Sequence, residues 1–239
     1  DAYNSVGYWD YLSVRGYTLD HRFNYRRDGL PISAETSLPL ENKERVEFLK
    51  GTSGIQAGTS APGGLVNYVV KRPTEKKLRT LRLETTHRGG LLAHVDLGGR
   101  FGENQRFGYR LNVAAEDIQS HVPTADGSRH LLALAMDWRV SPDTLIEGEI
   151  ESSRRRQPSV PGLSLLGNTL PPANPFININ SQPWSQANVF DNLSGSVGIQ
   201  QAINSQWRWQ GQLGTQRLKS DDRLAYPFGC YAAGSGAYY

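Results

Sequence analysis

The stretch Phe107-Gly-Tyr-Arg-Leu-Asn-Val-Ala-Ala-Glu116 alternates between two kinds of side chain at nearly every step. The odd-numbered residues from Phe107 to Ala115 form an apolar series, whereas Arg110, Asn112 and Glu116 belong to the other series. Successive side chains of a β-strand point to opposite faces of its sheet. The spacing therefore predicts a long strand with one apolar and one polar face.

Six other segments repeat this alternation, so the sequence predicts about seven strands. With 107–119, they are 78–85, 91–101, 129–140, 144–153, 192–203 and 207–218. Glycine accounts for 25 of the 239 residues and aromatic residues for 10%, which favours a turn-rich β-protein over a helical bundle or a disordered chain. The longest apolar run, 131–136, is far shorter than the roughly 18 residues that a membrane-spanning helix needs.

The connections between the predicted strands alternate in length. Short turns fall at 102–106, 141–143 and 204–206, whereas the connections at 120–128 and 154–188 are longer. Aromatic residues gather beside the short turns: Phe101, Phe107, Tyr109, Trp138, Trp207 and Trp209. Short turns at one rim, long loops at the other and an aromatic girdle are typical of an outer-membrane β-barrel. The alternative is a soluble β-sandwich, but its strands usually run about five or six residues, shorter than several of these segments.

Several features favour a piece of a larger protein. The sequence begins at Asp1 with neither an initiator methionine nor a signal peptide. Seven strands would leave both edges of the sheet unpaired, which lipid does not tolerate. We therefore expect an incomplete barrel. The single Cys230 either pairs with a cysteine elsewhere in the protein or is an ordinary thiol.

Residues 1–73 follow a different pattern, and a charged linker at 74–77 separates them from the rest. Short β-prone runs at 11–15, 45–50 and 65–71 alternate with loops, and the glycines of 51–64 predict tight turns. Pro39 suits the first turn of a helix, which predicts a helical turn over 39–44. The predicted fold is thus a small α+β domain over 1–73, followed by the antiparallel strands of an incomplete transmembrane β-barrel over 78–239.

Three motifs follow one another in the first half: Ser13-Val-Arg-Gly-Tyr17, Arg27-Asp-Gly-Leu-Pro-Ile32 and Glu44-Arg-Val-Glu-Phe-Leu-Lys-Gly51. The last continues through Gly58-Thr-Ser-Ala-Pro-Gly-Gly-Leu-Val-Asn67 to Val70-Lys-Arg-Pro73. In order and spacing they resemble the plug domain of TonB-dependent outer-membrane receptors, in the form of the ferric-siderophore branch. The resemblance implies a receptor of the bacterial outer membrane, in contact with its lipid, that imports ferric siderophores and catalyses no reaction.

The resemblance also implies partners and sites. Iron would arrive as a siderophore chelate, with no cofactor and no protein-bound metal, and an inner-membrane energy-coupling protein would act through a segment absent from this chain. Plug loops facing the cell exterior contact the chelate in this family. The matching segments here contain Tyr8, Trp9, Tyr11, Asp20, His21, Arg22, Phe23 and Tyr25. The alternative is that half of these aromatic residues only pack the plug against the barrel.

Arg15 and Lys50 match basic positions of the family that pair with carboxylates of the barrel wall. The family usually has arginine at the second position, and Lys50 lacks its bidentate fork. The alternative is that both side chains are simply solvated. Glu147, Glu149 and Glu151 alternate on one predicted strand, so we expect them to line a polar lumen. The triplet Arg154-Arg-Arg156 either attracts anionic chelates or lipopolysaccharide phosphates, or is a solvated loop base.

Other functions find little support in the sequence. The histidines lack the paired spacing of a zinc site, and the glycine-rich loop lacks a phosphate-binding motif. The 26 basic and 23 acidic residues are interspersed along the chain, which does not favour nucleic acid as a partner. Two alternatives stay open: a receptor of the same architecture for haem, cobalamin or a glycan, and a soluble β-rich enzyme or adhesin.

Overall fold

The structure of the chain, a computed structural model, describes residues 6–9, 11–50, 58, 61, 63–160, 174, 176, 178, 181, 185–223, 227–230 and 236–238. Much of the glycine-rich stretch 51–64, residues 161–173 of the long loop and the side chain of Cys230 lie outside these described residues. Within the described ranges, no helix has the length and apolar character needed to cross a membrane.

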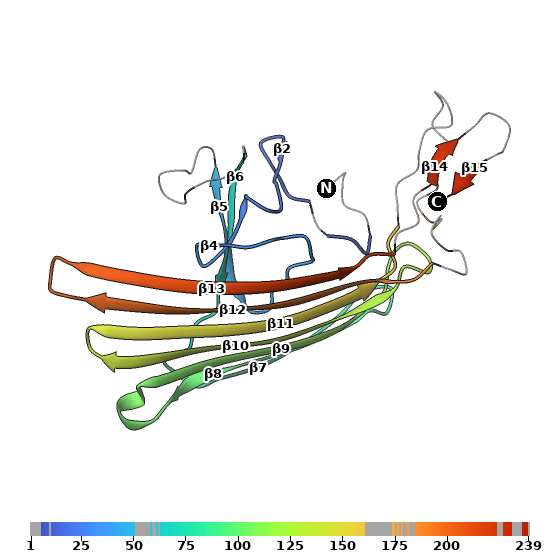
Figure 1. Ribbon diagram of the computed structural model, residues 1–239. Helices are drawn as coiled ribbons and strands as arrows, with labels where there is room; N and C mark the ends of the chain where they lie inside the picture. The colour runs from blue at the N-terminus through green and yellow to red at the C-terminus, as the bar shows by residue number, and fades with distance from the viewer. Residues whose placement is uncertain are drawn as a thin grey trace.

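Seven strands form one antiparallel sheet, which we name the wall (Figure 1). They are β7 (Leu78–Thr85), β8 (Leu91–Phe101), β9 (Phe107–Ile118), β10 (Gly127–Ser141), β11 (Thr144–Gln157), β12 (Asn188–Ala202) and β13 (Arg208–Asp221). Each strand pairs with its neighbour in sequence, and the described sheet is open between β7 and β13. All seven predicted strands and their incomplete closure are confirmed.

One face of the wall is apolar, as the alternation predicts. The register aligns Phe101 with Phe107 and Phe107 with Trp138, and their rings stack at centroid distances of 5.6 and 5.8 Å. These rings lie beside the short turns, one of which contains a 3-10 helix, η1 (Glu103–Gln105). Further along the strands, large apolar side chains are exposed on the same face: Leu81, Val113, Leu132, Met136, Leu193, Val197 and Leu213. This outward face is the surface that a β-barrel presents to lipid.

A smaller unit, residues 6–73, lies against the opposite face of the wall (Figure 1), and we name it the inner unit. Its sheet has the order β4-β3-β6-β5, with β3 parallel to β6. The strands are β3 (Tyr25–Arg27), β4 (Leu30–Pro31), β5 (Lys43–Lys50) and β6 (Gly64–Val70), next to a hairpin of β1 (Ser13–Val14) and β2 (Tyr17–Thr18). A separate hairpin, β14 (Pro227–Cys230) with β15 (Gly236–Tyr238), follows the wall. Leu19, Tyr25, Ala34, Val66 and Tyr68 form the core of the inner unit.

The predicted helical turn over 39–44 is wrong. The Lys43 N–H donates to the Leu40 carbonyl oxygen at 3.0 Å, which closes a single turn, and β5 begins at Lys43. Asn42 and Lys43 are both buried because their side chains bond to a carboxylate of the wall. These contacts with the wall favour an extended backbone here, and they override the preference that Pro39 gives for a first helical turn.

Candidate functional site

Five rings of the inner unit form a continuous aromatic cluster. Tyr8 and Trp9 lie 3.9 Å apart between ring centroids, and Trp9 contacts His21 at 5.8 Å. His21 also meets Tyr11 at 4.8 Å and stacks on Tyr25 at 5.6 Å. Tyr25 is only 1% exposed and belongs to the core. The structure therefore brings together five of the eight residues that the sequence predicts to bind ligand, with Tyr25 beneath the others.

The cluster lies at the long-loop end of the wall and contacts it directly. Phe190 of β12 approaches Tyr8 and Trp9 with centroid distances of 6.0 and 6.3 Å. The Tyr8 hydroxyl donates to Asp222 Oδ2 at 2.9 Å, and burial together with this hydrogen bond raises the pKa of Tyr8. Tyr8 thus remains a neutral donor at physiological pH. The Nε1–H of Trp9 is buried and has no acceptor among the described residues.

The other three predicted ligand residues lie together on an exposed turn. Arg22 pairs with Asp20 at 3.1 Å, and its guanidinium lies 5.4 Å from the centroid of the Phe23 ring. Hydrogen bonds from Arg22 lower the pKa of Asp20, so this carboxylate stays ionised. Asp20 also accepts the backbone N–H of Arg22 at 2.8 Å, which holds the turn. This turn offers an exposed guanidinium beside an aromatic face.

Gly7→Ala is expected to pull the aromatic cluster away from the wall. A Cβ at Gly7 would collide with the carbonyl of Pro158, and its φ of +75° is already unfavourable for alanine. The Val160 N–H donates to the Val6 carbonyl at 3.0 Å, so we expect faster hydrogen exchange at Val160. Gly16→Ala is the control, because Gly16 has a similar φ of +82° but open space around its Cβ. Equal exchange at Val160 in both variants would contradict the collision.

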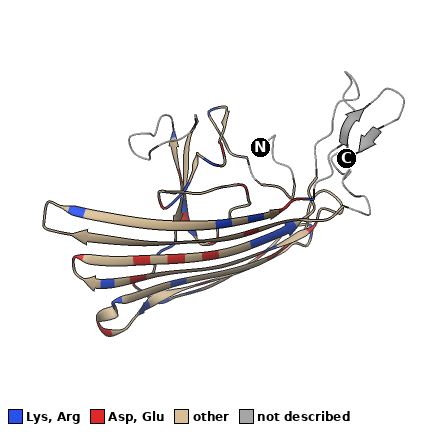
Figure 2. Cartoon of the chain, in the orientation of Figure 1, with Lys and Arg blue, Asp and Glu red and all other residues tan. Residues whose placement is uncertain are grey.

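Two buried carboxylates of the wall hold the inner unit. Glu149 and Glu151 are two residues apart on β11, a strand on which Figure 2 marks acidic residues in red, and both are buried. Arg27 pairs with both, at 3.0 Å from Glu151, and Lys43 lies 2.6 Å from Glu151. Asn42 donates to the same Glu151 oxygen at 2.6 Å. The expected inward orientation of these glutamates is observed, although basic side chains of the inner unit cover them.

The charges of this network are nearly excluded from water. The side chain of Glu151 is 0% exposed and that of Lys43 is 3% exposed. Burial lowers the pKa of Lys43, while the negative charge of Glu151 acts in the opposite direction. Ser196 on β12 donates to Glu149 at 3.2 Å, and the guanidinium of Arg27 donates to the hydroxyl oxygen of Ser194 on the same strand. The wall and the inner unit therefore share one polar core.

Further ion pairs join the two parts at other points. Arg72 pairs with Asp28 at 2.9 Å and lies 3.6 Å from Glu147 of the wall, and Lys71 pairs with Asp96 at 2.8 Å. Glu41 of the inner unit meets Arg129 at 2.5 Å. Burial tends to raise the pKa of Glu41, but the guanidinium of Arg129 outweighs it, so the pKa lies below its usual value. The contact between the inner unit and the wall is thus distributed over β8, β10 and β11.

Sequence reasoning missed Arg27 and Lys43 as partners of the wall. It selected Arg15 and Lys50, which are exposed and have no ion pair with any side chain that the structure describes. Their pairing with other carboxylates stays a prediction. Two features of the sequence could have identified Arg27 as a partner of the wall. Arg27 lies in the second of the three motifs, and the three glutamates expected to face the lumen need cations as partners. No local pattern marks Lys43, because its partner is 108 residues away.

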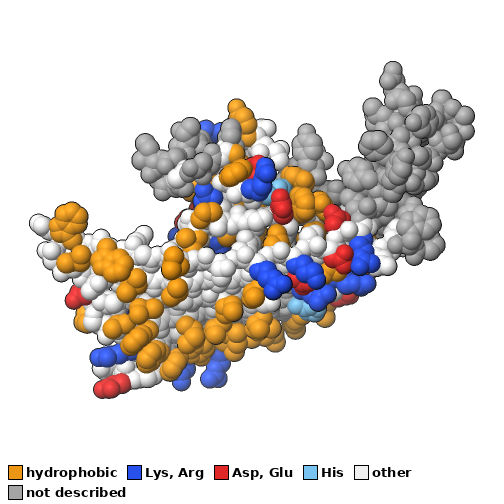
Figure 3. Space-filling view, in the orientation of Figure 1, with side chains coloured by type: hydrophobic (Ala, Val, Ile, Leu, Met, Phe, Trp, Pro, Cys, Tyr) orange, Lys and Arg blue, Asp and Glu red, His pale blue; other side chains and the backbone are white. Residues whose placement is uncertain are grey.

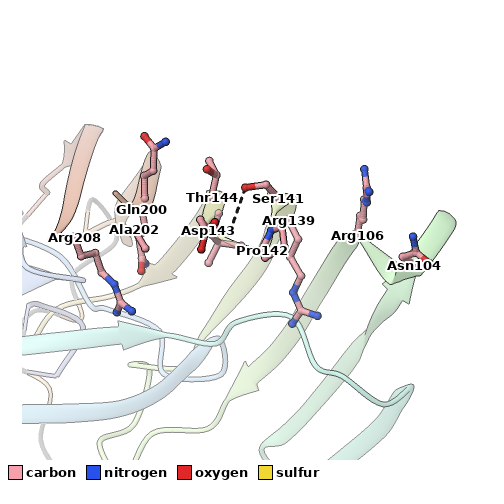
Figure 4. Close-up of a pocket in the computed structure, with 12 residues that line it drawn as sticks. Asn104, Arg106, Arg139, Ser141, Pro142, Asp143, Thr144, Gln200, Ala202 and Arg208 are labelled. Carbon is pink, nitrogen blue, oxygen red and sulfur yellow. Dashed lines mark hydrogen bonds between the residues drawn. The ribbon is translucent and has the colours of Figure 1, made fainter. Parts of the chain in front are cut away.

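A polar cavity of about 540 Å³ lies at the opposite, short-turn end of the wall (Figure 4). Arg106, Arg139 and Arg208 from different strands or turns line it, together with Asp143. Arg139 pairs with Glu75. No aromatic side chain is among the residues that line this cavity. The cavity is therefore separate from the aromatic cluster and offers no stacking surface to a ligand.

The comparisons with known proteins identify this arrangement. Residues 2–65 match the family described as TonB-dependent Receptor Plug Domain. Residues 2–65 are therefore a TonB-dependent receptor plug domain, and the fold of the described chain is that of TonB-dependent outer-membrane receptors. The inner unit is accordingly the plug, and the wall is part of the barrel. We use these family terms from here on.

Individual relatives agree with this assignment. The metal-pseudopaline receptor CntO of Pseudomonas aeruginosa is 36% identical over 114 residues, which cover 48% of this chain and 16% of that receptor. The ferrichrome receptor FcuA of Yersinia enterocolitica is 21% identical over 226 residues, or 90% of this chain and 29% of FcuA. The structure of the P. aeruginosa ferripyoverdine receptor bound to ferripyoverdine covers 97% of this chain and 32% of that one, with 18% identity and a TM-score of 0.76. The chain thus spans less than a third of these two curated relatives.

Proposed function

We propose that the receptor containing this chain imports a metal ion held in a small-molecule chelate, and that the chelate is a ferric siderophore. The observation that carries the proposal is the aromatic cluster of Tyr8, Trp9 and Tyr11 at the long-loop end of the plug. Relatives named as receptors for ferrichrome and ferripyoverdine support the same class of ligand. Iron is the cargo in this proposal, and the chelate is recognised as a whole.

The chemistry of the cluster suits such a chelate. Ferric siderophores are bulky, often aromatic and often anionic, so ring faces and guanidinium groups are suitable contacts. Tyr8, Trp9 and Tyr11 are half-buried and would supply stacking surfaces, and Trp9 also has a donor without an acceptor among the described residues. Arg22 and Phe23 are exposed and would meet the outer part of the ligand. His21 and Tyr25 support these rings from below, and Asp20 orients Arg22.

Trp9→Ala in the intact receptor is expected to weaken binding of the ferric siderophore. Loss of a large stacking ring at the centre of a site costs about 2 kcal/mol, or roughly 30-fold in Kd. The measurement is a titration of the purified receptor with a panel of radioactively labelled ferric siderophores. Trp207→Ala is the matched control, because Trp207 is 69% exposed beside a short turn of the wall. Unchanged affinity in Trp9→Ala would place the ligand elsewhere.

A second candidate is a metal–pseudopaline chelate, which the 36% identity to CntO favours. The same titration with metal-loaded pseudopaline distinguishes the two candidates. Binding of pseudopaline chelates alone would replace the ferric siderophore as the ligand, whereas binding of haem, cobalamin or a glycan alone would overturn both.

Energy for import would come from an inner-membrane coupling protein that pulls on the plug from the periplasm. The distributed ion pairs between plug and wall support this part of the proposal, because they must be broken when the plug rearranges. Uptake of the labelled chelate by cells with and without a functional coupling protein tests it. Equal uptake in both strains would contradict energy coupling.

A further inference from the structure

The inward face of β12 and β13 carries uncharged side chains over most of its length, unlike that of the neighbouring strands. Its inward residues lie opposite one another in the register, and we name them the neutral track: Ser194, Ser196, Gly198 and Gln200 of β12 with Gln216, Gly214, Gln212 and Gln210 of β13. They face the plug because Ser196 lies opposite the buried Glu149 of β11, and inward residues alternate along a strand. Every ion pair that the structure describes between plug and wall ends on β8, β10 or β11 instead.

A series of three cavities follows the neutral track. Cavities of about 250 and 470 Å³ lie between the track and the plug, and both are lined by Ser196. The second of them shares Gln200 with the cavity of about 540 Å³ at the short-turn end. Ser194 and Ala202, at the two ends of the series on β12, are eight residues apart, which corresponds to roughly 26 Å of strand. The three cavities therefore adjoin one another from the middle of the wall to its short-turn rim.

The series of cavities begins near the aromatic cluster and ends at a group of arginines. Phe190 lies on the same face of β12 as Ser194, closer to the long-loop end, and contacts Trp9 of the cluster. At the short-turn end, Arg106, Arg139 and Arg208 line the cavity of Figure 4. Arg106 and Arg208 form no ion pair with any side chain that the structure describes. The neutral track thus connects the side of the cluster with a cationic mouth.

A short segment of the plug, residues 30–33, closes the track at the end near the cluster, and we name it the gate. A Cβ at Gly214 would lie 2.6 Å from Leu30 Cδ1, so the Leu30 side chain occupies the space that this glycine leaves. The Ser33 N–H donates to Gln216 Oε1 at 2.8 Å, and Gln216 Nε2 donates to the Ser33 carbonyl oxygen at 3.1 Å. The gate has no charged side chain, so neutral contacts hold it against the track.

We propose that the neutral track is the route along which the chelate passes from the aromatic cluster to the periplasm once the gate has moved. The inference deepens the proposed function and rests on it. The middle cavity, of about 470 Å³, is within the size range of small-molecule sites. An anionic chelate that reaches the short-turn end would meet the guanidinium groups of Arg106 and Arg208.

The chemistry of the track suits passage better than storage. Its hydroxyl and amide groups form hydrogen bonds with a polar cargo, but they lack the charge that would hold an anion in place. A pathway conducts when each site binds its cargo weakly enough to release it. A route along β11 would instead place the cargo between buried opposite charges, such as those of Lys43 and Glu151. The distribution of charge therefore favours β12 and β13.

Gly198→Trp in the intact receptor tests the route. A Cβ at Gly198 would be no closer than 3.5 Å to its neighbours, so the indole ring can enter the middle cavity. The probe is the labelled chelate that the wild type binds most tightly, chosen from ferric siderophores and metal-loaded pseudopaline. We expect Gly198→Trp to keep the wild-type Kd but to lose most of its uptake into cells.

Gly148→Trp is the matched control and should keep both binding and uptake. Gly148 lies opposite the exposed Met136 and Val197, so it belongs to the outward face, on which Figure 3 shows a band of apolar side chains. A Cβ at Gly148 would be 3.7 Å from its nearest neighbour, as little crowded as one at Gly198. The two variants therefore differ in the face of the wall that receives the ring.

Cross-linking of the gate provides a second, independent measurement. Leu30→Cys with Gly214→Cys, bridged by a short thiol reagent, should stop uptake, because the gate can then no longer leave the track. Thr74→Cys with Gly98→Cys, bridged in the same way, should leave uptake unchanged, since that contact of 2.7 Å joins the linker to β8. Wild-type cells treated with the reagent control for modification of Cys230.

The outcomes separate the route from the proposed function. Uptake by Gly198→Trp at the wild-type rate, or uptake that persists after the gate is bridged, would overturn the route. Equal loss of uptake in both cross-linked pairs would also overturn it, because the plug would then have to leave the other strands as well. Wild-type cells that take up none of the chelates would overturn the proposed function itself.

Discussion

Glu151→Gln is expected to loosen the plug from the wall more than any other change of a single charge. The substitution keeps the shape of the side chain but leaves Lys43 and Arg27 buried, with Glu149 as the remaining carboxylate of this network. Removal of one partner from a buried ion pair costs about 3–5 kcal/mol. Hydrogen exchange of the β3, β5 and β6 amides in the intact receptor should therefore accelerate by about 100-fold or more.

The control is Glu84→Gln, because Glu84 and its partner Arg82 are 44% and 60% exposed on the edge strand β7. An exposed pair contributes about 1 kcal/mol or less, so plug exchange should barely change. Adding Lys43→Met to Glu151→Gln should restore much of the protection from hydrogen exchange, because one of the two buried cations that lost the Glu151 charge is then absent. Plug exchange that is equally slow in Glu151→Gln and wild type would show that this network does not hold the plug.

Gly64→Ala is expected to separate β5 from β6. Gly64 has φ +122°, and an added Cβ would collide with the Leu49 carbonyl oxygen of the neighbouring strand. Strain and overpacking together cost about 2–5 kcal/mol. Because β6 is the central partner of both β3 and β5, the whole plug sheet should loosen. Trypsin should then cleave the intact receptor after Lys43, which is buried in the wild type.

Gly29→Ala provides the comparison for this effect. Gly29 also has a positive φ, +84°, but a Cβ there has nothing within 4 Å. The substitution therefore adds backbone strain without a collision, and cleavage after Lys43 should stay close to wild type. If both variants are cleaved at the same rate, backbone strain rather than the Leu49 contact limits the β5–β6 pairing.

The wall could be predicted closely because its strands obey a rule of period two. Lipid on one side and a polar interior on the other require the alternation seen from Phe107 to Glu116, and the structure places that segment in β9. The short turns and the girdle of Phe101, Phe107 and Trp138 follow from the same rule. The plug strands were recognised in outline, whereas the helical turn over 39–44 was wrong because contacts with the wall decide the backbone there.

The contacts between plug and wall could not be read from the sequence. Arg27 and Glu149 are 122 residues apart, and their meeting depends on how the plug sheet is seated against β11. A basic residue in a motif predicts a charge but does not predict its partner, so Arg27 and Lys43 were missed, and the pairing of Arg15 and Lys50 stays a prediction. For the aromatic cluster, the sequence indicated which residue types are present. That Tyr25 is buried beneath His21 could be seen only in the folded plug.

The three inward glutamates of β11 link the position of the plug to the register of a single strand. Glu147 faces Arg72 after β6, Glu149 faces Arg27 in β3, and Glu151 faces Lys43 at the start of β5. A slip of β11 by one residue would turn all three carboxylates toward lipid at once, since the side-chain period of a strand is two. The plug can therefore dock in this arrangement only when β11 is in its native register between β10 and β12. The register of one strand of the barrel thus determines all three of these contacts with the plug together.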